Sequence, residues 1–332
     1  MTTQRTYNQA MIDARMHIEH GTVPMLWGAG GIGKSAMGAE IASDMGIGFI
    51  DTRPSLREAV DFRGLPVPDL VTGKTRWLIP NDFPQVERDG PRGIWMLDEI
   101  SACQLSVQVA LYSLIWDGHL GEYRKPDGWI IMGAGNRVQD RAAAMRMSTA
   151  LQNRVAHIDV EVDHIAWCDW GSLNGIHPLL QAFIRWRSEL LFKFSPDARE
   201  YPSPRSWTMA NRYIPLSDRS ARMRLMGQIV GREAAGEFEA FADIVSELEP
   251  VPFILANPTT ARIPEPSKIA AMYGATVALA MNIDKRTAKA GATYIRRLPA
   301  DFHALFAKLV TMRDAKLASY GFADLVTHTG NL

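Results

Sequence analysis

Residues 28–35 constrain this chain more than any other stretch. They read Gly-Ala-Gly-Gly-Ile-Gly-Lys-Ser and match the pattern G-x-x-x-x-G-K-[ST] at each fixed position. A short apolar run at 23–27 precedes them and an Ala- and Met-rich run at 35–44 follows, which predicts a strand, a loop and a helix in that order. Glycines let backbone N–H groups turn toward phosphate oxygens, and the helix N-terminus adds a favourable dipole. The sequence therefore predicts a phosphate-binding loop.

This loop defines the first set of candidate site residues. We expect the Lys34 ammonium to reach the β- and γ-phosphates of ATP and the Ser35 hydroxyl to ligate Mg²⁺. The predicted cofactors are therefore ATP and Mg²⁺. The predicted nucleotide-binding residues are Gly28, Ala29, Gly30, Gly31, Ile32, Gly33, Lys34 and Ser35.

A second element lies about 60 residues downstream, at 94–99, and reads Ile-Trp-Met-Leu-Asp-Glu. An apolar run that follows a turn signal, here at 90–93, is typical of a buried parallel strand. Ligands of open α/β sheets bind at the carboxyl ends of such strands. We expect Asp98 to hold the metal and Glu99 to act as the general base for the attacking water.

A third apolar run, at 129–136, ends in Asn136. An amide at that strand end could hydrogen-bond the γ-phosphate or the attacking water. The same Gly-Asn pair also suits a plain turn, so the prediction depends on the first two elements.

These three elements, in this order, resemble the Walker A, Walker B and sensor 1 elements of AAA+ ATPases. The chain resembles the MoxR branch in particular, within the helix-2-insert group. Four further stretches carry this resemblance, which covers about residues 5–215. They are 61–66, 75–80, 110–123 and the Ser-Pro-Arg-Ser run at 203–206.

The resemblance implies roles for three more side chains. Asn136 matches sensor 1, and Arg205 matches sensor 2, an arginine that touches the nucleotide of its own subunit. Arg154 matches the arginine finger, which acts on the nucleotide of a neighbouring subunit. With Glu99, these residues make up the predicted catalytic set.

The assignment of Arg154 departs from the family pattern. Relatives usually have Arg-Phe at this point, whereas this chain has Arg154-Val155. Arg141 and Arg146 lie nearby and are alternative candidates for the finger.

The resemblance also implies a function. It implies a MoxR-like ATPase that hydrolyses ATP in a hexameric ring of identical subunits and remodels or activates a protein partner. It further implies a partner with a von Willebrand factor type A domain. The alternative is a nucleic-acid motor or loader, for example in phage DNA metabolism. Basic residues on the loop hairpins would favour that alternative, and Lys74, Arg76, Arg124 and Lys125 leave the choice open.

Composition agrees with a globular ATPase. Of 332 residues, 47% are hydrophobic, and the formal net charge is zero, so no overall charge draws the chain to nucleic acid or acidic membranes. The two cysteines form no metal-binding spacing and are expected to be reduced thiols. The N-terminal residues lack the apolar core of a signal peptide, and no apolar run is long enough for a transmembrane helix. We therefore expect a cytoplasmic protein without a membrane partner.

The order of predicted elements indicates an α/β fold: a P-loop NTPase (AAA+) parallel sheet with helices on both faces, followed by an all-helical lid. We expect a nucleotide-binding domain at 1–160, a helical lid at 161–250 and a helical C-terminal extension at 251–332. The predicted strands lie near 23–27, 47–51, 94–97, 129–134 and 155–160.

Other segments give weaker predictions. We expect a loop with a hairpin at 61–85, and its Trp77 is a candidate for contact with substrate in a central pore. Continuous helical periodicity covers 221–246, and the prolines near 250–258 predict a linker. Aromatic residues at helical spacing predict the core of the lid. They are Trp167, Trp170, Phe183, Trp186, Phe192, Phe194 and Trp207.

Overall fold

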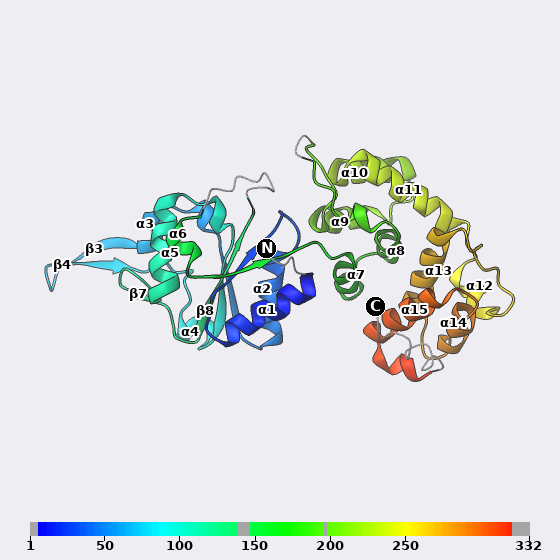
Figure 1. The fold of residues 1–332 in the computed structure, drawn as a ribbon, viewed down its shortest axis with the longest axis horizontal. Coiled ribbons are helices and arrows are strands. Elements are labelled where there is room, and N and C mark those ends of the chain that lie inside the picture. Colours follow the sequence, from blue (N-terminus) through cyan, green and yellow to red (C-terminus); the bar gives the residue numbers. More distant parts are fainter. Residues whose placement is uncertain (1–5, 138–146, 196–197, 321–332) are drawn as a thin grey trace. The chain divides into compact units, whose positions relative to one another are not determined.

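The computed structural model describes residues 6–137, 147–195 and 198–320. The chain divides into two compact units, Met1–Val162 and Asp163–Leu332. The first unit combines strands and helices, and the second is helical throughout its described residues (Figure 1). The finer partition at residue 250 stays a prediction. No described helix is long and apolar enough to span a membrane.

The first unit is built on a five-stranded sheet in the order β2-β5-β8-β1-β9. Every neighbouring pair in it is parallel. The strands are β1 (Pro24–Trp27), β2 (Gly48–Thr52), β5 (Gly93–Leu97), β8 (Trp129–Gly135) and β9 (Ala156–Asp159). The predicted parallel sheet is therefore confirmed, and all of its strands lie where the apolar runs predicted them.

Helices α1 (Tyr7–Glu19) and α2 (Lys34–Asp44) cover one face of this sheet (Figure 1). The close packing of α2 depends on Gly38. A Cβ built on Gly38 would lie 3.1 Å from the Phe49 ring and 3.4 Å from the sulfur atoms of Met96 and Met132. A side chain at Gly38 would therefore require the Phe49 ring to shift.

The opposite face carries α5 (Leu105–Asp117). Because side chains alternate along a strand, Trp95, Leu97 and Ile131 point away from α2. They form one buried cluster with Leu111 and its neighbours on α5. The sheet is thus covered on both sides, as predicted.

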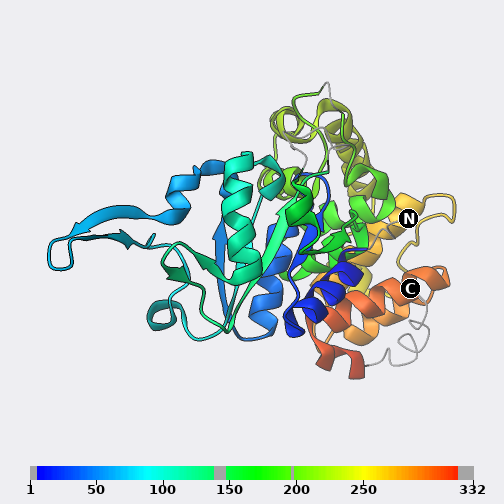
Figure 2. The same ribbon diagram turned by 60° about the vertical axis from the view of Figure 1, so that its left-hand side comes forward.

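Two hairpins extend the first unit. The longer one pairs β3 (Leu65–Asp69) with β4 (Lys74–Leu78), which confirms the hairpin predicted within 61–85. It projects well beyond the sheet (Figure 2). The shorter one pairs β6 (His119–Leu120) with β7 (Tyr123–Arg124). The remaining short elements of this unit are α3 (Ala59–Arg63), α4 (Val86–Asp89), α6 (Thr149–Gln152), η1 (Pro54–Leu56) and η2 (Ile100–Ala102).

The second unit packs helices around an aromatic core. The Phe183 ring lies 5.5–5.6 Å from the rings of Trp207, Phe238 and Phe241. Its helices are α7 (His164–Leu173), α8 (Pro178–Trp186), α9 (Pro204–Ala210), α10 (Arg219–Val230), α11 (Arg232–Ser246), α12 (Val251–Ala256), α13 (Ile269–Asn282), α14 (Ala288–Ile295) and α15 (Ala300–Arg313). Three 3₁₀ turns complete it: η4 (Ser188–Leu190), η5 (Asn211–Tyr213) and η6 (Ala315–Ser319).

Three sequence predictions about this unit were wrong. The helical run at 221–246 breaks at Gly231, whose φ of +87° is a left-handed conformation that glycine tolerates. The predicted linker after residue 250 contains α12, because Pro252 sits in its first turn, where no backbone donor is needed. Trp170 and Phe194 are exposed and do not belong to the aromatic core.

The cluster between the sheet and α5 gives a stability prediction. Leu111→Ala should lower the free energy of unfolding by about 2–5 kcal/mol, because it leaves a cavity in a fully buried cluster. Val109→Ala, on the same helix but 63% exposed, should change it by no more than about 0.5 kcal/mol. Urea titration followed by tryptophan fluorescence measures both. Equal effects would contradict the assigned packing of α5.

Candidate nucleotide-binding site

The loop between β1 and α2 has a backbone that requires its glycines. Gly31 and Gly33 have φ values of +81° and +99°. A Cβ on Gly28 would lie 2.6 Å from Ile32 Cδ1 and 2.7 Å from the Val160 carbonyl oxygen. Side chains at these positions would therefore strain the loop or clash within it.

Lys34 opens α2 and turns its side chain back over this loop. Its ammonium donates hydrogen bonds to the carbonyl oxygens of Gly28 (2.7 Å) and Ala29 (2.8 Å) and to Asn136 Oδ1 (2.9 Å). Only 7% of Lys34 is exposed. These three acceptors are neutral groups, and the ammonium brings a positive charge to the start of α2. Such a charge at a helix N-terminus favours an anion.

Ser35 and Asp98 come together from different elements. Ser35 Oγ donates a hydrogen bond of 2.5 Å to Asp98 Oδ2. Asp98 follows β5, and its backbone N–H bonds the Thr52 carbonyl at the end of β2, which fixes its place at the sheet edge. Nearby, burial and the negative charge of Asp98 raise the pKa of Asp51. The Asp51 and Asp98 carboxylates therefore lie close enough for their charges to interact, which favours a cation beside them.

This oxygen pair fits Mg²⁺. The ion prefers oxygen ligands, keeps several waters and is usually held by one or two protein groups together with substrate phosphates. Within the described residues no group of three His, Cys, Asp or Glu side chains could hold a metal by itself. Ser35 and Asp98 therefore match a metal that arrives with a nucleotide.

Glu99 has an unusual backbone. With φ 60° and ψ 31°, it is the only described non-glycine residue with a positive φ. That conformation costs about 1–2 kcal/mol, and such strain clusters at functional sites. Its Oε2 accepts a hydrogen bond of 2.7 Å from Ser55 Oγ. Ser55 was missed from the sequence because it belongs to no motif and lies 44 residues away.

Asn136 lies at the end of β8, the strand between β1 and β5. Its backbone N–H donates to Ser101 Oγ at 2.9 Å, and its side chain meets Lys34. The structure thus gathers Lys34, Ser35, Asp98 and Asn136 at one edge of the sheet. Glu99 follows Asp98 directly.

Arg154 lies elsewhere in the first unit, between α6 and β9. Its guanidinium is 4.1 Å from the Tyr112 ring centroid and 5.0 Å from that of Trp116, both on α5. It donates hydrogen bonds to Tyr112 Oη (2.5 Å) and the Ala150 carbonyl (2.7 Å), and none of these contacts involves the glycine loop.

This aromatic seat, made of Tyr112 and Trp116, was not predicted. The two rings are four residues apart on one helix, a spacing that places them on the same face. Trp116 is 64% exposed. Among the described residues no carboxylate pairs with Arg154. Its charge is therefore held in place without being neutralised.

Three other predicted arginine positions do not add to this geometry. Arg205 is exposed in the first turn of α9, in the second unit. Ser203 caps that helix by accepting the Ser206 backbone N–H at 3.1 Å. Arg141 and Arg146 lie outside the described residues.

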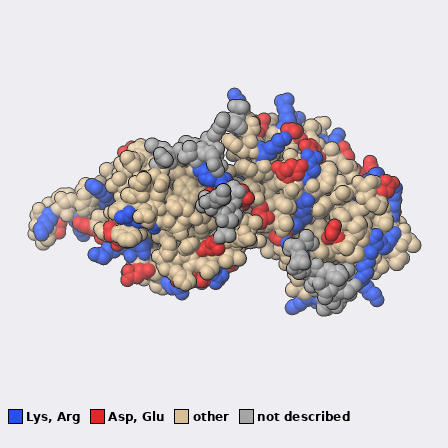
Figure 3. Space-filling model, viewed as in Figure 1, with Lys and Arg blue, Asp and Glu red and all other residues tan. Residues whose placement is uncertain are grey.

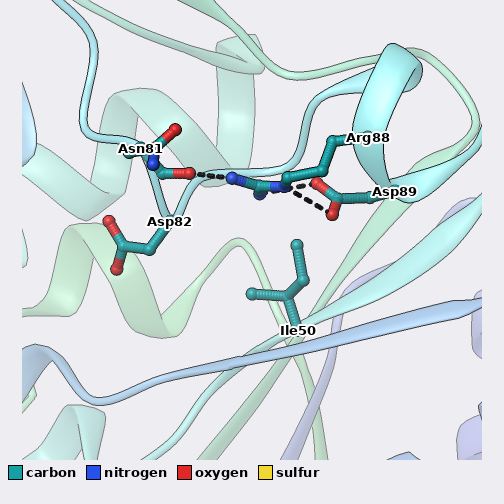
Figure 4. Close-up of a pocket in the computed structure, with 5 residues that line it drawn as sticks. All are labelled: Ile50, Asn81, Asp82, Arg88 and Asp89. Carbon is teal, nitrogen blue, oxygen red and sulfur yellow. Dashed lines mark hydrogen bonds and ion pairs between the residues drawn. The ribbon is translucent and has the colours of Figure 1, made fainter.

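A shallow pocket of about 490 Å³ lies against Ile50 on the edge strand β2 (Figure 4). Arg88 and Asp89 form an ion pair there, and Arg88 also donates to the Asn81 carbonyl. Asp82 pairs with Arg57. These charged groups bond to one another and hold the 81–89 segment in place. None of them is a predicted site residue.

The first unit has a parallel α/β fold with a glycine-rich loop between β1 and α2. Its parallel sheet, its strand–loop–helix element and the acidic end of β5 are the parts that the sequence predicted.

Comparisons with known proteins add little to this. No family model matches the sequence, and no curated protein matches it. Among solved structures, the RuvB Holliday junction branch migration motor of Thermotoga maritima is 16% identical, with a TM-score of 0.34 over 97% of this chain and 85% of that one. NtrX from Brucella abortus in complex with ADP is 14% identical, with a TM-score of 0.36 over 96% and 66%. Because these values are low, no conclusion rests on either match.

The position of Lys34 gives a binding prediction. Lys34→Ala should abolish detectable binding of a fluorescent ATP analogue, because the loop loses the cation that its carbonyls hold in place. Lys74→Ala, an exposed lysine on the β3–β4 hairpin, is the control and should bind like the parent protein. Undiminished binding by Lys34→Ala would show that the nucleotide sits elsewhere.

Proposed function

We propose that this protein is an ATP hydrolase, a MoxR-like AAA+ ATPase that works in an oligomeric ring. The observation that carries the proposal is the convergence of Lys34, Ser35, Asp98 and Asn136 at one sheet edge, with Glu99 beside them. A cation, a metal-ligand pair, a carboxylate base and an amide are the groups that phosphoryl transfer to water requires.

Each group has a defined task in this proposal. Lys34 exchanges its carbonyl partners for phosphate oxygens and offsets their charge. Glu99 accepts a proton from the attacking water, and Asn136 orients that water or the γ-phosphate. Ser35 and Asp98 would hold Mg²⁺, which supplies charge neutralisation on the phosphates when bound.

Ser55 orients the Glu99 carboxylate for this task. Its Oγ donates a hydrogen bond to Oε2, and a carboxylate can accept further hydrogen bonds at either oxygen. Glu99 can therefore accept the proton while Ser55 holds its side chain.

Arg154 supports a site that is completed between subunits. An arginine over the half-buried Tyr112 ring and the exposed Trp116 ring, with no carboxylate partner among the described residues, suits contact with an anion on another molecule. In our proposal that anion is the γ-phosphate of a neighbour in a hexameric ring, while Arg205 contacts the nucleotide of its own subunit. An arginine supplied in trans contributes on the order of 10³–10⁵ in rate.

The hairpins support a protein client. Leu70 and Val71, at the tip of the β3–β4 hairpin, are 92% and 95% exposed. An exposed apolar tip is suited to contact with a polypeptide. We propose that the ring remodels or activates a cytoplasmic protein partner, with a von Willebrand factor type A domain as the expected partner module.

A nucleic-acid motor is the second candidate. Lys74 and Arg76 are exposed on β4 and favour it. Lys125 does not, because its ammonium donates to the Trp129 carbonyl and burial lowers its pKa. Strong stimulation of ATP hydrolysis by DNA, falling steeply with salt, would favour this candidate over the protein remodeller.

A mixing experiment tests both hydrolysis and its completion in trans. Glu99→Gln should bind ATP but hydrolyse it about 10²–10⁴-fold more slowly, because the base is lost while Asp98 remains. Arg154→Ala should also be nearly inactive. Mixed together, the two should recover activity, because about a quarter of the interfaces in a random ring pair an intact Glu99 with an intact Arg154. ATPase activity is measured against the mixing ratio.

The control is a mixture of Glu99→Gln with Lys34→Ala, whose interfaces all lack either the base or the nucleotide. It should stay inactive. Mixtures that co-assemble by size-exclusion chromatography but show no recovery would contradict a trans role for Arg154. Parent-like activity of Glu99→Gln alone would contradict the proposed base.

A further inference from the structure

The C-terminal part of the second unit is basic in a chain that is neutral overall. Residues 251–332 contain ten Lys and Arg but only five Asp and Glu. The rest of the chain therefore carries a matching excess of acid. Such segregation of charge is a physical signal of an anionic partner for the basic region.

The basic residues concentrate on α14 and the turn before it. Lys289 lies on α14, Lys285 lies in the turn before the helix, and Arg296 is the C-cap residue. All three are exposed, whereas Ala288 and Ala292 are buried against the rest of the unit. Exposed cations thus occur before, on and at the end of this helix.

A second segment adds to these cations. Tyr294 Oη donates a hydrogen bond of 2.8 Å to the Arg262 carbonyl, and Arg297 donates one of 2.9 Å to the Pro258 carbonyl. These bonds tie the 258–262 segment to α14. Arg262 is itself exposed. In Figure 3, blue side chains gather over this region with few red ones between them.

Acidic groups contact part of this surface, since the Glu249 carboxylate accepts the Arg262 backbone N–H. Within the described ranges, Lys285, Arg286 and Lys289 form no ion pair and no side-chain hydrogen bond. The nearest acid in sequence, Asp284, accepts bonds from the Thr287 hydroxyl and backbone and from the Arg286 backbone N–H. Its carboxylate therefore stabilises the turn that leads into α14.

We propose that this basic surface, formed by Arg262, Lys285, Arg286, Lys289 and Arg296, binds the phosphate backbone of nucleic acid. Lys and Arg side chains on a protein surface contact phosphates, and phosphate contacts carry no information on base sequence. The surface itself is less suited to a membrane, because its five residues are all charged and the exposed hydrophobic side chains at 251–269, Phe253 and Ile269, are not part of it.

This inference goes beyond the proposed function and does not depend on it. The surface belongs to the second unit and needs neither ATP nor a ring. It would hold the protein on nucleic acid while ATP hydrolysis drives the remodelling of a protein partner. A failure of ATP hydrolysis would therefore leave it standing, and its own failure would leave the ATPase proposal standing.

The test uses the full chain without nucleotide and a fluorescent DNA duplex about 30 base pairs long, with anisotropy as the readout. We expect binding with a Kd of about 10⁻⁴–10⁻⁶ M at physiological salt and a steep loss of affinity as salt rises. Lys285→Glu with Lys289→Glu should weaken binding at least about tenfold and lower the slope of log K against log salt by about 2.

The matched control is Arg224→Glu with Arg232→Glu, two exposed arginines of the same unit that are not part of the basic surface. It changes the net charge equally and should retain most of the affinity. An equal loss in both double variants would overturn the proposal, since binding would then follow net charge. Binding to vesicles of anionic phospholipid without binding to the duplex would also overturn it. Lys285→Ala with Lys289→Ala, checked by thermal melting, repeats the test with a smaller change.

Discussion

The position of the Lys34 ammonium is the interaction on which the candidate site depends. A buried lysine must find acceptors, and here two loop carbonyls and the Asn136 amide provide them. The same bonds tie the loop to the end of β8, so one charged group sets the shape of the loop and joins two strands. A phosphate that takes the place of those acceptors gains a cation that is already in position.

Two further charged groups are held by partners that are weaker than those they would meet in the reaction. Ser55 holds the Glu99 carboxylate through a neutral hydroxyl, and the aromatic seat holds Arg154 through ring faces. Hydrogen bonds to neutral groups are weaker than bonds between opposite charges. Both groups can therefore move when a nucleotide and a neighbouring subunit supply stronger partners. The fold thus orders the Glu99 and Arg154 side chains but leaves them able to change partners.

The parts of the site that consist of short, contiguous sequence motifs were predicted from the sequence. The glycine loop, the apolar strand that ends in Asp98 and Glu99, and the strand before Asn136 are of this kind, because local pattern determines both structure and role. Ser55 and the aromatic seat could not be predicted, because they depend on how segments far apart in the chain pack together. The error after residue 250 has a different cause, since proline ends a helix in its interior but is tolerated in its first turn.

A structure determined with Mg²⁺ and a non-hydrolysable ATP analogue tests the central claim most directly. The account predicts that Lys34 Nζ leaves the Gly28 and Ala29 carbonyls and bonds phosphate oxygens, with Ser35 and Asp98 beside the metal. A nucleotide bound elsewhere, with Lys34 still bonded to those two carbonyls, would contradict it.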